Sequence, residues 1–215
     1  GGNTFAKALA NASPGSIARW LLTTADVYQL VSISRKVIKT AGSSEGALEN
    51  VFKKMDLAIE AANNIVAQQL FRTSAGSIGV ISAISTDTVT LTRQGDTVNF
   101  RKGMVVQVIT DGVGTAFRDS GEELVVSATD FSASTVTFTT NVTTDVAGTV
   151  VGDHLIRSGS CGDGTTPTPS AIAGLASWVP DTTPGSTAFF SQDRSLDATL
   201  LGGHRIDATS GQLDQ

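Results

Sequence analysis

The chain has 215 residues, of which 40% are hydrophobic and only 16% are charged, a composition that excludes a disordered chain and allows a sizeable core. The net charge of −5 argues against broad electrostatic binding to nucleic acid. A single cysteine and two histidines exclude an intrachain disulfide framework and a zinc site built from several thiolates, and they leave few options for histidine catalysis.

Targeting and membrane signals are not evident in the sequence. It holds no run of about 18 apolar residues, so we expect no membrane-spanning segment. The first residues, Gly1–Thr4, do not form a basic region followed by an apolar stretch, so we expect no signal peptide. The composition favours a soluble, reduced, β-rich protein with little catalytic equipment.

Residues 16–38 carry apolar side chains in strand-like groups. The first group includes Ile17 and residues 20–22, and the second runs from Val27 to Ile33. Residues 23–26 separate the two groups and are polar enough for a turn. This pattern predicts an extended hairpin.

A long amphipathic helix is predicted over residues 45–72. Ser43 or Ser44 can cap its start, and Glu49 and Lys53 form an i,i+4 pair in the favourable order. We expect it to stop near residues 73–76, with Gly76 as a left-handed stop. Such a helix would be roughly 42 Å long, and its apolar stripe needs a long covering surface, either a sheet or a neighbouring subunit. The stripe comprises Leu48, Val51, Phe52, Met55, Ala58, Ile59, Ala62, Ile65, Val66 and Leu70.

The apolar period changes to two after Gly79, and short strands separated by Gly, Asp, Asn and Ser are expected. Their spacing predicts a sandwich, a barrel or a long meander. The expected strands are 80–84, 88–91, a strand with Val98 and Phe100, 104–109, 124–128, 135–138, and a last one with Val150 and residues 155–156.

The remainder of the chain shows little periodicity. Residues 158–169 are rich in Gly, Ser, Thr and Pro and predict a loop. Residues 174–203 contain apolar and aromatic residues without a regular pattern. We expect this segment to be held by packing against another part of the fold.

Candidate catalytic and metal-binding groups are sparse. His154 and Cys161 have Asp153 and Asp163 nearby, but a metal site needs three or four convergent ligands, so we interpret them as a strand-end histidine and a buried free thiol. No Gly-x-Ser-x-Gly elbow supports a hydrolase. We therefore predict no enzyme, no cofactor and no metal site.

Large and charged side chains outside the helix suit packing or contacts between subunits. Two tryptophans are expected to anchor packing rather than to bind a ligand, and a small basic cluster surrounds residues 35–39. The candidate interface or packing residues are Trp20, Tyr28, Arg35, Lys36, Trp178, Asp193, Arg194 and Asp197.

The order of the motifs indicates a known family. An extended Trp-Leu-Leu-Thr-Thr segment (20–24) precedes the long helix, and a Thr-Val-Thr-Leu strand (88–91) follows it. Later come Asn-Phe-Arg-Lys-Gly-Met-Val-Val (99–106) and Gly-Asp-His-Leu-Ile-Arg-Ser-Gly (152–159). The chain closes with Gly-Leu (174–175), Trp-Val-Pro (178–180), Phe-Phe (189–190), Asp-Arg-Ser-Leu-Asp (193–197) and Leu-Leu-Gly-Gly (200–203). From about Arg19 to Gly203, the sequence resembles the major capsid proteins of tailed bacteriophages with the Hong Kong 97-type fold.

The resemblance implies an α+β capsid fold with four segments. Residues 1–42 would form the N-terminal arm and extended loop, 43–79 the spine helix, and 80–160 a β-rich region or inserted β-domain. Residues 161–215 would be a loop-rich segment leading toward the axial domain. Family members continue beyond the point that corresponds to Gln215, so the resemblance implies a chain that lacks the C-terminal part of the fold.

The resemblance also implies function and partners. The chain would be a structural, non-enzymatic subunit of an icosahedral phage shell, assembled in the host bacterial cytoplasm and located in the virion. It would form hexamers and pentamers, contact portal, scaffold and decoration proteins, and touch packaged DNA weakly and non-specifically. No membrane partner is implied.

Two other functions share parts of the pattern. A β-rich binding module of a phage tail or adhesin would also be rich in Thr, Ser and Gly, but its long helix would need a strict coiled-coil heptad. The spacings 3, 1, 3, 3, 1 from Leu48 to Ile59 fit a broad core face better. An encapsulin-like compartment shell with the same fold is the other alternative.

Overall fold

The computed structural model describes residues 4–5, 19–28, 30–36, 39, 45–162, 165–180, 183–186 and 188–203. The fold is mixed α+β, with an antiparallel sheet and few helices in the described part. The helices are α3 (Glu45–Leu70), α4 (Val142–Asp145), α5 (Leu175–Trp178) and α6 (Ala198–Leu201), and the 3-10 helices are η1 (Gln94–Asn99), η2 (Asp119–Gly121) and η3 (Arg194–Asp197).

The predicted long helix is confirmed as the 26-residue α3. It ends at Leu70, two residues before the expected end. Gly76 does adopt the left-handed conformation, with φ of +71°. It does so in a separate turn after the helix, closed by its own N–H, which donates to the Thr73 carbonyl at 2.9 Å.

Six antiparallel strands close into a barrel in the order β1-β2-β5-β4-β3-β6. The barrel is one of the architectures that the strand spacing predicts. Three of the pairings, β2 with β5, β3 with β6 and β1 with β6, join strands that are not consecutive in the chain. The strands are β1 (Ser77–Ser85), β2 (Thr88–Leu91), β3 (Val105–Ile109), β4 (Glu123–Asp130), β5 (Thr135–Phe138) and β6 (His154–Arg157).

Two of the expected strand positions are wrong. Val98 belongs to η1, where the Asn99 side-chain amide donates to the Ile78 carbonyl at 2.9 Å and fixes the turn against the barrel. Val150 lies in a turn before β6 and is exposed. In both cases an apolar residue beside a buried residue produces a strand-like sequence pattern where no strand forms.

The inward-facing side chains of the strands make one apolar core. Alternate residues of β2 and β5 are buried, as a two-residue period requires. Side chains from α4 and from the loop before β3 complete it. The buried members are Ile78, Ile81, Val89, Leu91, Phe100, Val106, Val108, Leu124, Val126, Val136, Phe138, Val142, Val146 and Leu155.

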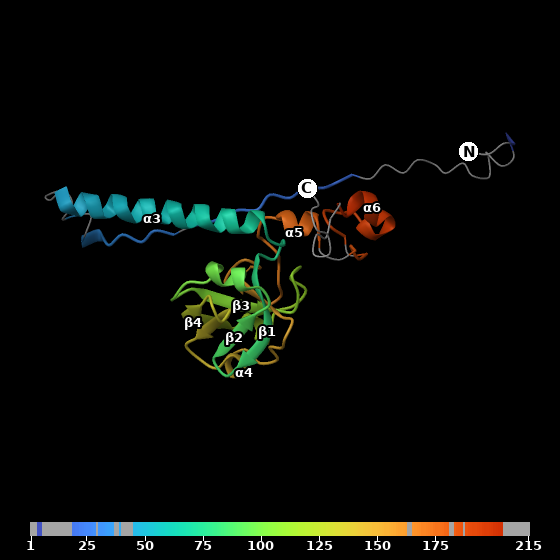
Figure 1. The fold of residues 1–215 in the computed structure, drawn as a ribbon. Coiled ribbons are helices and arrows are strands. Elements are labelled where there is room, and N and C mark those ends of the chain that lie inside the picture. Colours follow the sequence, from blue (N-terminus) through green and yellow to red (C-terminus); the bar gives the residue numbers. More distant parts are fainter. Residues whose placement is uncertain are drawn as a thin grey trace, which may run out of the picture. The chain divides into compact units, whose positions relative to one another are not determined.

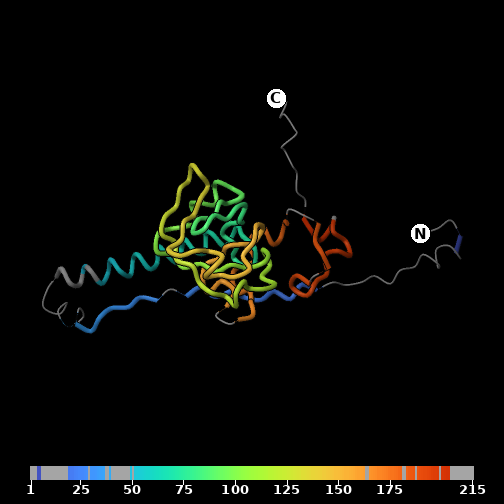
Figure 2. The backbone as a smooth tube through the Cα atoms, turned by 90° about the horizontal axis from the view of Figure 1, so that it is seen from below, coloured from blue at the N-terminus to red at the C-terminus, as the bar shows by residue number. Residues whose placement is uncertain are grey.

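The chain enters and leaves the barrel through neighbouring strands. Ser77, the first residue of β1, pairs with Ile156 of β6, one residue before that strand ends. In Figures 1 and 2 the strands, coloured from green to yellow, form one body that follows the C-terminal end of α3 in the chain. The two ends of the barrel therefore lie side by side.

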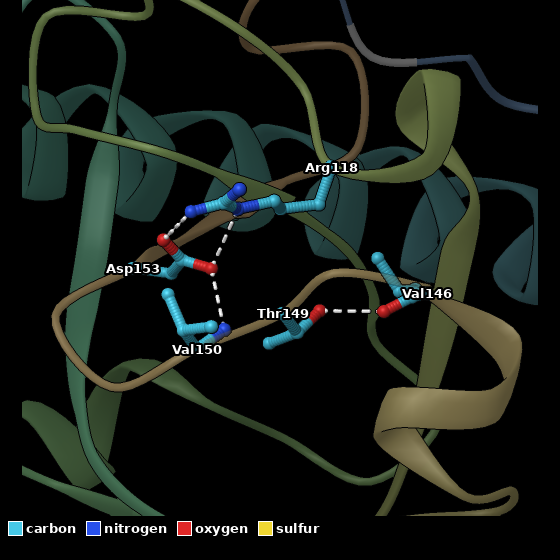
Figure 3. A network of polar contacts seen from close by, with 5 residues as sticks. All are labelled: Arg118, Val146, Thr149, Val150 and Asp153. Atoms are coloured by element: carbon cyan, nitrogen blue, oxygen red, sulfur yellow. Dashed lines mark hydrogen bonds and ion pairs between the residues drawn. The ribbon is translucent and has the colours of Figure 1, made fainter.

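A part-buried ion pair ties Arg118, just before η2, to the loop before β6. The Asp153 carboxylate, whose side chain is 2% exposed, accepts from Nε and Nη2 of Arg118 at 2.8 Å each. It also accepts from the Val150 backbone N–H at 2.8 Å (Figure 3). The side-chain hydrogen bond to Asp153 raises the pKa of the Arg118 guanidinium above its usual range. In the same loop the Thr149 hydroxyl donates to the Val146 carbonyl at 2.7 Å.

Residues 172–178 pack on the end of α3, whereas the sequence predicts packing against another part of the fold without saying which. The Ile172 N–H donates to Gln69 Oε1 at 3.3 Å, and the Ser74 N–H donates to Ser177 Oγ at 2.7 Å. Gly174 lies so close that a β-carbon there would be 2.1 Å from the Gln69 carbonyl oxygen. Only glycine leaves room for this approach.

The chain forms two compact units, one of Thr24–Asp181 with His204–Gln215 and a smaller one of Gly1–Thr23 with Thr182–Gly203. In the smaller unit the Leu21 N–H donates to the Phe190 carbonyl at 3.1 Å, and the Gln192 side-chain amide donates to the Arg19 carbonyl at 2.6 Å. Trp20 meets Phe189 edge to face, with ring centroids 6.1 Å apart. Segments from the two ends of the described chain therefore build this unit together.

Candidate functional site

One surface feature of the described part is an open apolar stripe on α3, formed by Phe52, Met55 and Ile59. Their side chains are 59%, 46% and 59% exposed. The sequence predicts that the whole stripe is covered, by a sheet or by a neighbour. Within the chain Ile65, near the C-terminal end, is only 9% exposed, and Val51, Ala58 and Ala62 are half-buried. Ile65 lines a small crevice together with Ile78 and Arg157 of the barrel. A sheet therefore does not cover the stripe along its length, and cover by a neighbouring subunit stays a prediction.

The end of α3 is held to the barrel by polar contacts. Arg72 Nη2 lies 2.9 Å from Asp96 Oδ1 of η1, and both side chains are largely buried. With the Gly174 contact and the two hydrogen bonds described above, this anchors the helix at one end. The open stripe lies on the other half of the helix.

The described part of the segment before α3 is extended without forming a strand, although the Leu21 N–H donates to the Phe190 carbonyl. In residues 19–28 and 30–34 no strand forms, so the predicted hairpin is wrong for this part. A tight hairpin turn needs residues that accept positive φ, and residues 23–26 contain neither glycine nor asparagine. Alternate side chains, Ala25, Val27, Val31 and Ile33, are nevertheless half-buried, as in a strand with one covered face.

The candidate residues of this segment lie on the surface. Tyr28 and Leu30 are 85% and 89% exposed, and the Tyr28 hydroxyl donates to Asp26 Oδ2 at 3.3 Å. Arg35 and Lys36 are exposed in a short helical stretch. They are thus positioned for contacts with a partner, which stays a prediction.

The candidate residues of the smaller unit serve local packing and helix capping. The Arg194 guanidinium carbon lies 4.2 Å from the centre of the Phe189 ring, and burial lowers the pKa of the guanidinium. Asp193 accepts from the Ser195 N–H at 2.9 Å, and Asp197 accepts from the Leu200 N–H at 3.1 Å. Together with Trp20, these residues fix the fold of the unit around Phe189.

Trp178 stands apart from that cluster, in α5 of the larger unit. Its indole N–H donates to the Ala173 carbonyl at 3.0 Å, and its side chain is 38% exposed. Its role as a packing anchor stays a prediction, because the side chain is exposed and this hydrogen bond is local.

His154 and Cys161 occupy structural positions. His154 Nδ1 is 2.8 Å from Ser77 Oγ, but Ser77 is only 6% exposed, so a substrate carbonyl could not reach this hydroxyl. Cys161 is fully buried, and burial raises the pKa of its thiol to about 11, which keeps it protonated and unreactive. Within the described ranges, no three His, Cys, Asp or Glu side chains form a group that could hold a metal ion.

The burial of His154 predicts a loss of stability in mild acid. Burial lowers the pKa of its imidazole despite the opposing charges of Asp111 and Asp153. The unfolded chain therefore binds a proton more readily as the pH falls below about 6.5, and the free energy of unfolding decreases there. Urea unfolding between pH 7.5 and 5 measures this slope. His154→Gln should flatten it, whereas an unchanged slope would mean that His154 does not contribute.

Several important residues carry no signal in the sequence alone. Gly174 and Arg118 act through partners that are 105 and 35 positions away from them in the chain, at Gln69 and Asp153. Arg157, which is half-buried beside the end of α3, likewise carries no signal in the sequence, because α3 is distant from it in the chain. A glycine before a helical Leu-Ala-Ser-Trp turn is the only local hint for the first of them.

None of the described helices has both the length and the apolar character needed to cross a membrane. Comparisons of the sequence with protein-family models and curated proteins, and of the structure with solved structures, found no match.

Proposed function

We propose that this chain is a structural subunit of an icosahedral tailed-phage capsid with the Hong Kong 97-type fold, which self-assembles into hexamers and pentamers that enclose the genome. The observation that carries the proposal is the open apolar stripe on α3. In this proposed role the chain is not catalytic and needs no cofactor.

The open stripe supports self-association because large apolar side chains in a row are costly in water. Phe52, Met55 and Ile59 follow one another at spacings of three and four on one face of the helix. A row of exposed apolar side chains rimmed by charges is typical of a protein interface. A shell subunit has neighbours on every side, and these supply the missing cover.

The extended segment supports the same proposal as a candidate arm. It has a strand-like alternation of covered and exposed side chains but no ladder partner in its described part. Tyr28 and Leu30 are almost fully exposed there. An arm of this kind gains its partner in the assembly, when it lies on the next copy.

Charge favours a shell whose contacts with the genome are weak. The chain carries 20 acidic and 15 basic residues. Strong binding to nucleic acid needs many phosphate contacts from Lys and Arg, so contact with packaged DNA would be weak and non-specific. Portal, scaffold and decoration proteins are the further partners of such a shell, whose place is the virion after assembly in the bacterial cytoplasm.

The test is the assembly state of the purified chain. Light scattering and negative-stain microscopy should show rings or shells. A strictly monomeric protein would contradict the proposal, and a monomer or trimer that binds sugar would favour a tail or adhesin module. Shells that are filled with enzyme cargo rather than nucleic acid would favour an encapsulin-like compartment.

The open stripe yields a specific prediction. Ile59→Asp should weaken self-association by about tenfold or more, because it places a charge at the centre of the contact. Since Ile59 is 59% exposed in the chain, the variant should still fold with an unchanged circular dichroism spectrum.

Lys54→Gln is the matched control for Ile59→Asp. It changes the net charge by the same amount but lies about 140° around the helix from Ile59. It should assemble like the unaltered protein. Equal assembly of both variants would show that the stripe is not the contact.

A further inference from the structure

A second group of exposed apolar side chains lies where α5 meets the end of α3. Gly174, the residue before α5, lies against the backbone carbonyl of Gln69, so the two helices meet at this point. The last residue of α3, the residue after it and two residues of α5 carry large exposed side chains there. We call them the junction patch: Leu70 (51% exposed), Phe71 (69%), Leu175 (55%) and Trp178 (38%).

The α5 part of the junction patch stands on backbone that the chain itself anchors. Leu175 and Trp178 are three positions apart, so they share one side of the short helix. Ser177 is buried and accepts from the Ser74 N–H at 2.7 Å. The Trp178 indole N–H donates to the Ala173 carbonyl at 3.0 Å, which fixes the ring. The patch is therefore held in place before any partner arrives.

The junction patch and the open stripe are separate surfaces. Ile59, the last residue of the stripe, is about 16 Å from Leu70 along the helix axis. Ile65, which lies between them in the chain, is buried. Contiguous exposed apolar side chains mark places where a partner binds. Each copy of the chain thus has two apolar surfaces that lack cover.

The exposed areas indicate which pairing of these surfaces makes a stable contact. With about 200 Å² for a large side chain, the stripe exposes roughly 300 Å² and the junction patch roughly 400 Å². Apolar atoms supply about 57% of a typical interface, and a stable interface buries about 1,200–2,000 Å² in total. Two stripes that face each other would bury only about 1,000 Å², whereas a stripe on a junction patch would bury about 1,200 Å².

Cover for both surfaces distinguishes the remaining arrangements. Two junction patches that face each other would also be large enough, but that contact leaves the stripe of every copy open. A stripe on a junction patch uses both surfaces of each copy in one kind of contact. Because the two surfaces differ, the contact is head-to-tail, the type that closes into rings.

We infer that the open stripe of one copy packs on the junction patch of a second copy of this chain. This inference rests on the proposed self-assembly and names a contact within it. Phe71 and Trp178 supply the aromatic side chains that are enriched at the centres of protein interfaces. In a closed ring every copy has both of its apolar surfaces covered.

Phe71→Asp should weaken self-association of the full chain by about tenfold or more, because it places a charge in an apolar contact. Sedimentation velocity over a range of concentrations measures this. Phe71 is largely exposed, so the variant should fold with an unchanged circular dichroism spectrum. Leu175→Asp repeats the test at a second position of the patch, since an acidic residue is favourable in the first turn of a helix.

Leu57→Asp is the matched control for both variants. Leu57 is 63% exposed on α3 and lies about 160° around the helix from Ile59, outside both surfaces. It should associate like the unaltered protein. If Leu57→Asp weakened association as much as Phe71→Asp, the added charge alone would explain the effect and the inference would fail.

A mixing experiment distinguishes this contact from contacts between like surfaces. Ile59→Asp keeps its junction patch, and Phe71→Asp keeps its stripe. Each should fail to associate alone, but an equal mixture should form one-to-one pairs, because one intact stripe and one intact patch remain. A two-fold contact between like surfaces would let one of the variants associate as well as the unaltered protein. That result, or no recovery in the mixture, would overturn the inference.

The outcomes separate this inference from the proposed function. If the unaltered protein assembles and both Phe71→Asp and Leu175→Asp assemble equally well, the contact with the junction patch is wrong and the shell proposal stands. If the unaltered protein stays monomeric at every concentration, both fail.

Discussion

Gly174→Ala should lower the thermal stability of the protein more than any other alanine substitution at a glycine of regular backbone conformation. The new β-carbon would lie 2.1 Å from the carbonyl oxygen of Gln69, 2.6 Å from that of Leu70 and 2.7 Å from that of Arg72. These are backbone atoms at the end of α3, so they cannot move aside as a side chain would. Either the α3 end or the 172–178 segment must shift.

The expected cost is about 3 kcal/mol, the upper part of the usual range for overpacking. For a chain of this size it corresponds to a melting temperature lower by about 6–12 °C. The shift would also weaken the Ser74–Ser177 and Gln69–Ile172 hydrogen bonds, which hold the same junction. Circular dichroism melting measures the effect.

Gly95→Ala is the matched control for Gly174→Ala. A β-carbon on Gly95 would have no atom within 4 Å, and its φ is not in the positive region. This variant should melt within about 2 °C of the unaltered protein, since a surface substitution of this kind changes stability little. If the two variants melted alike, the close approach at Gly174 would not be present in solution.

Arg118→Ala should destabilise the barrel by about 3 kcal/mol. The substitution leaves the Asp153 carboxylate buried, with the Val150 N–H still bound but without its cation. Breaking a buried pair from one side typically costs about 3–5 kcal/mol. The lower end applies because the Arg118 side chain is still 27% exposed. Urea unfolding followed by far-ultraviolet circular dichroism gives the free energy.

A second substitution tests whether the cost comes from the Asp153 carboxylate that has lost its cation. In the double variant Arg118→Ala/Asp153→Asn, no charge remains buried, and the asparagine oxygen can still accept from Val150. Part of the lost stability should therefore return. A single variant as stable as the unaltered protein would show that the pair does not support the barrel.

Elements with strong local periodicity could be predicted from the sequence. The apolar period of 3.6 residues predicts α3 to within two residues at its C-terminal end, and the two-residue alternation predicts β5 with its bounds. Here the local pattern and the tertiary environment agree. In η1 they do not, because a tertiary hydrogen bond from Asn99 decides the backbone conformation.

Features that depend on distant residues could not be predicted. The alternation of β1 and β6 gives no information about their pairing, although that pairing closes the barrel. The stripe on α3 indicates which face is apolar, but not that Phe52 and Ile59 lack a cover within the chain. The crevice at Arg157 and the glycine contact at the end of α3 arise only when segments about 90 to 105 residues apart come together.

The closure of the barrel limits how copies of this chain can join. An open sheet has a row of free N–H and C=O groups at each edge, and a neighbouring chain can add a strand there. In this barrel β1 is bonded to β6, so the ladder has no free edge even when many molecules crowd together. Association of the barrels by strand addition is thereby blocked, and contacts through them are left to side chains on their outer surface.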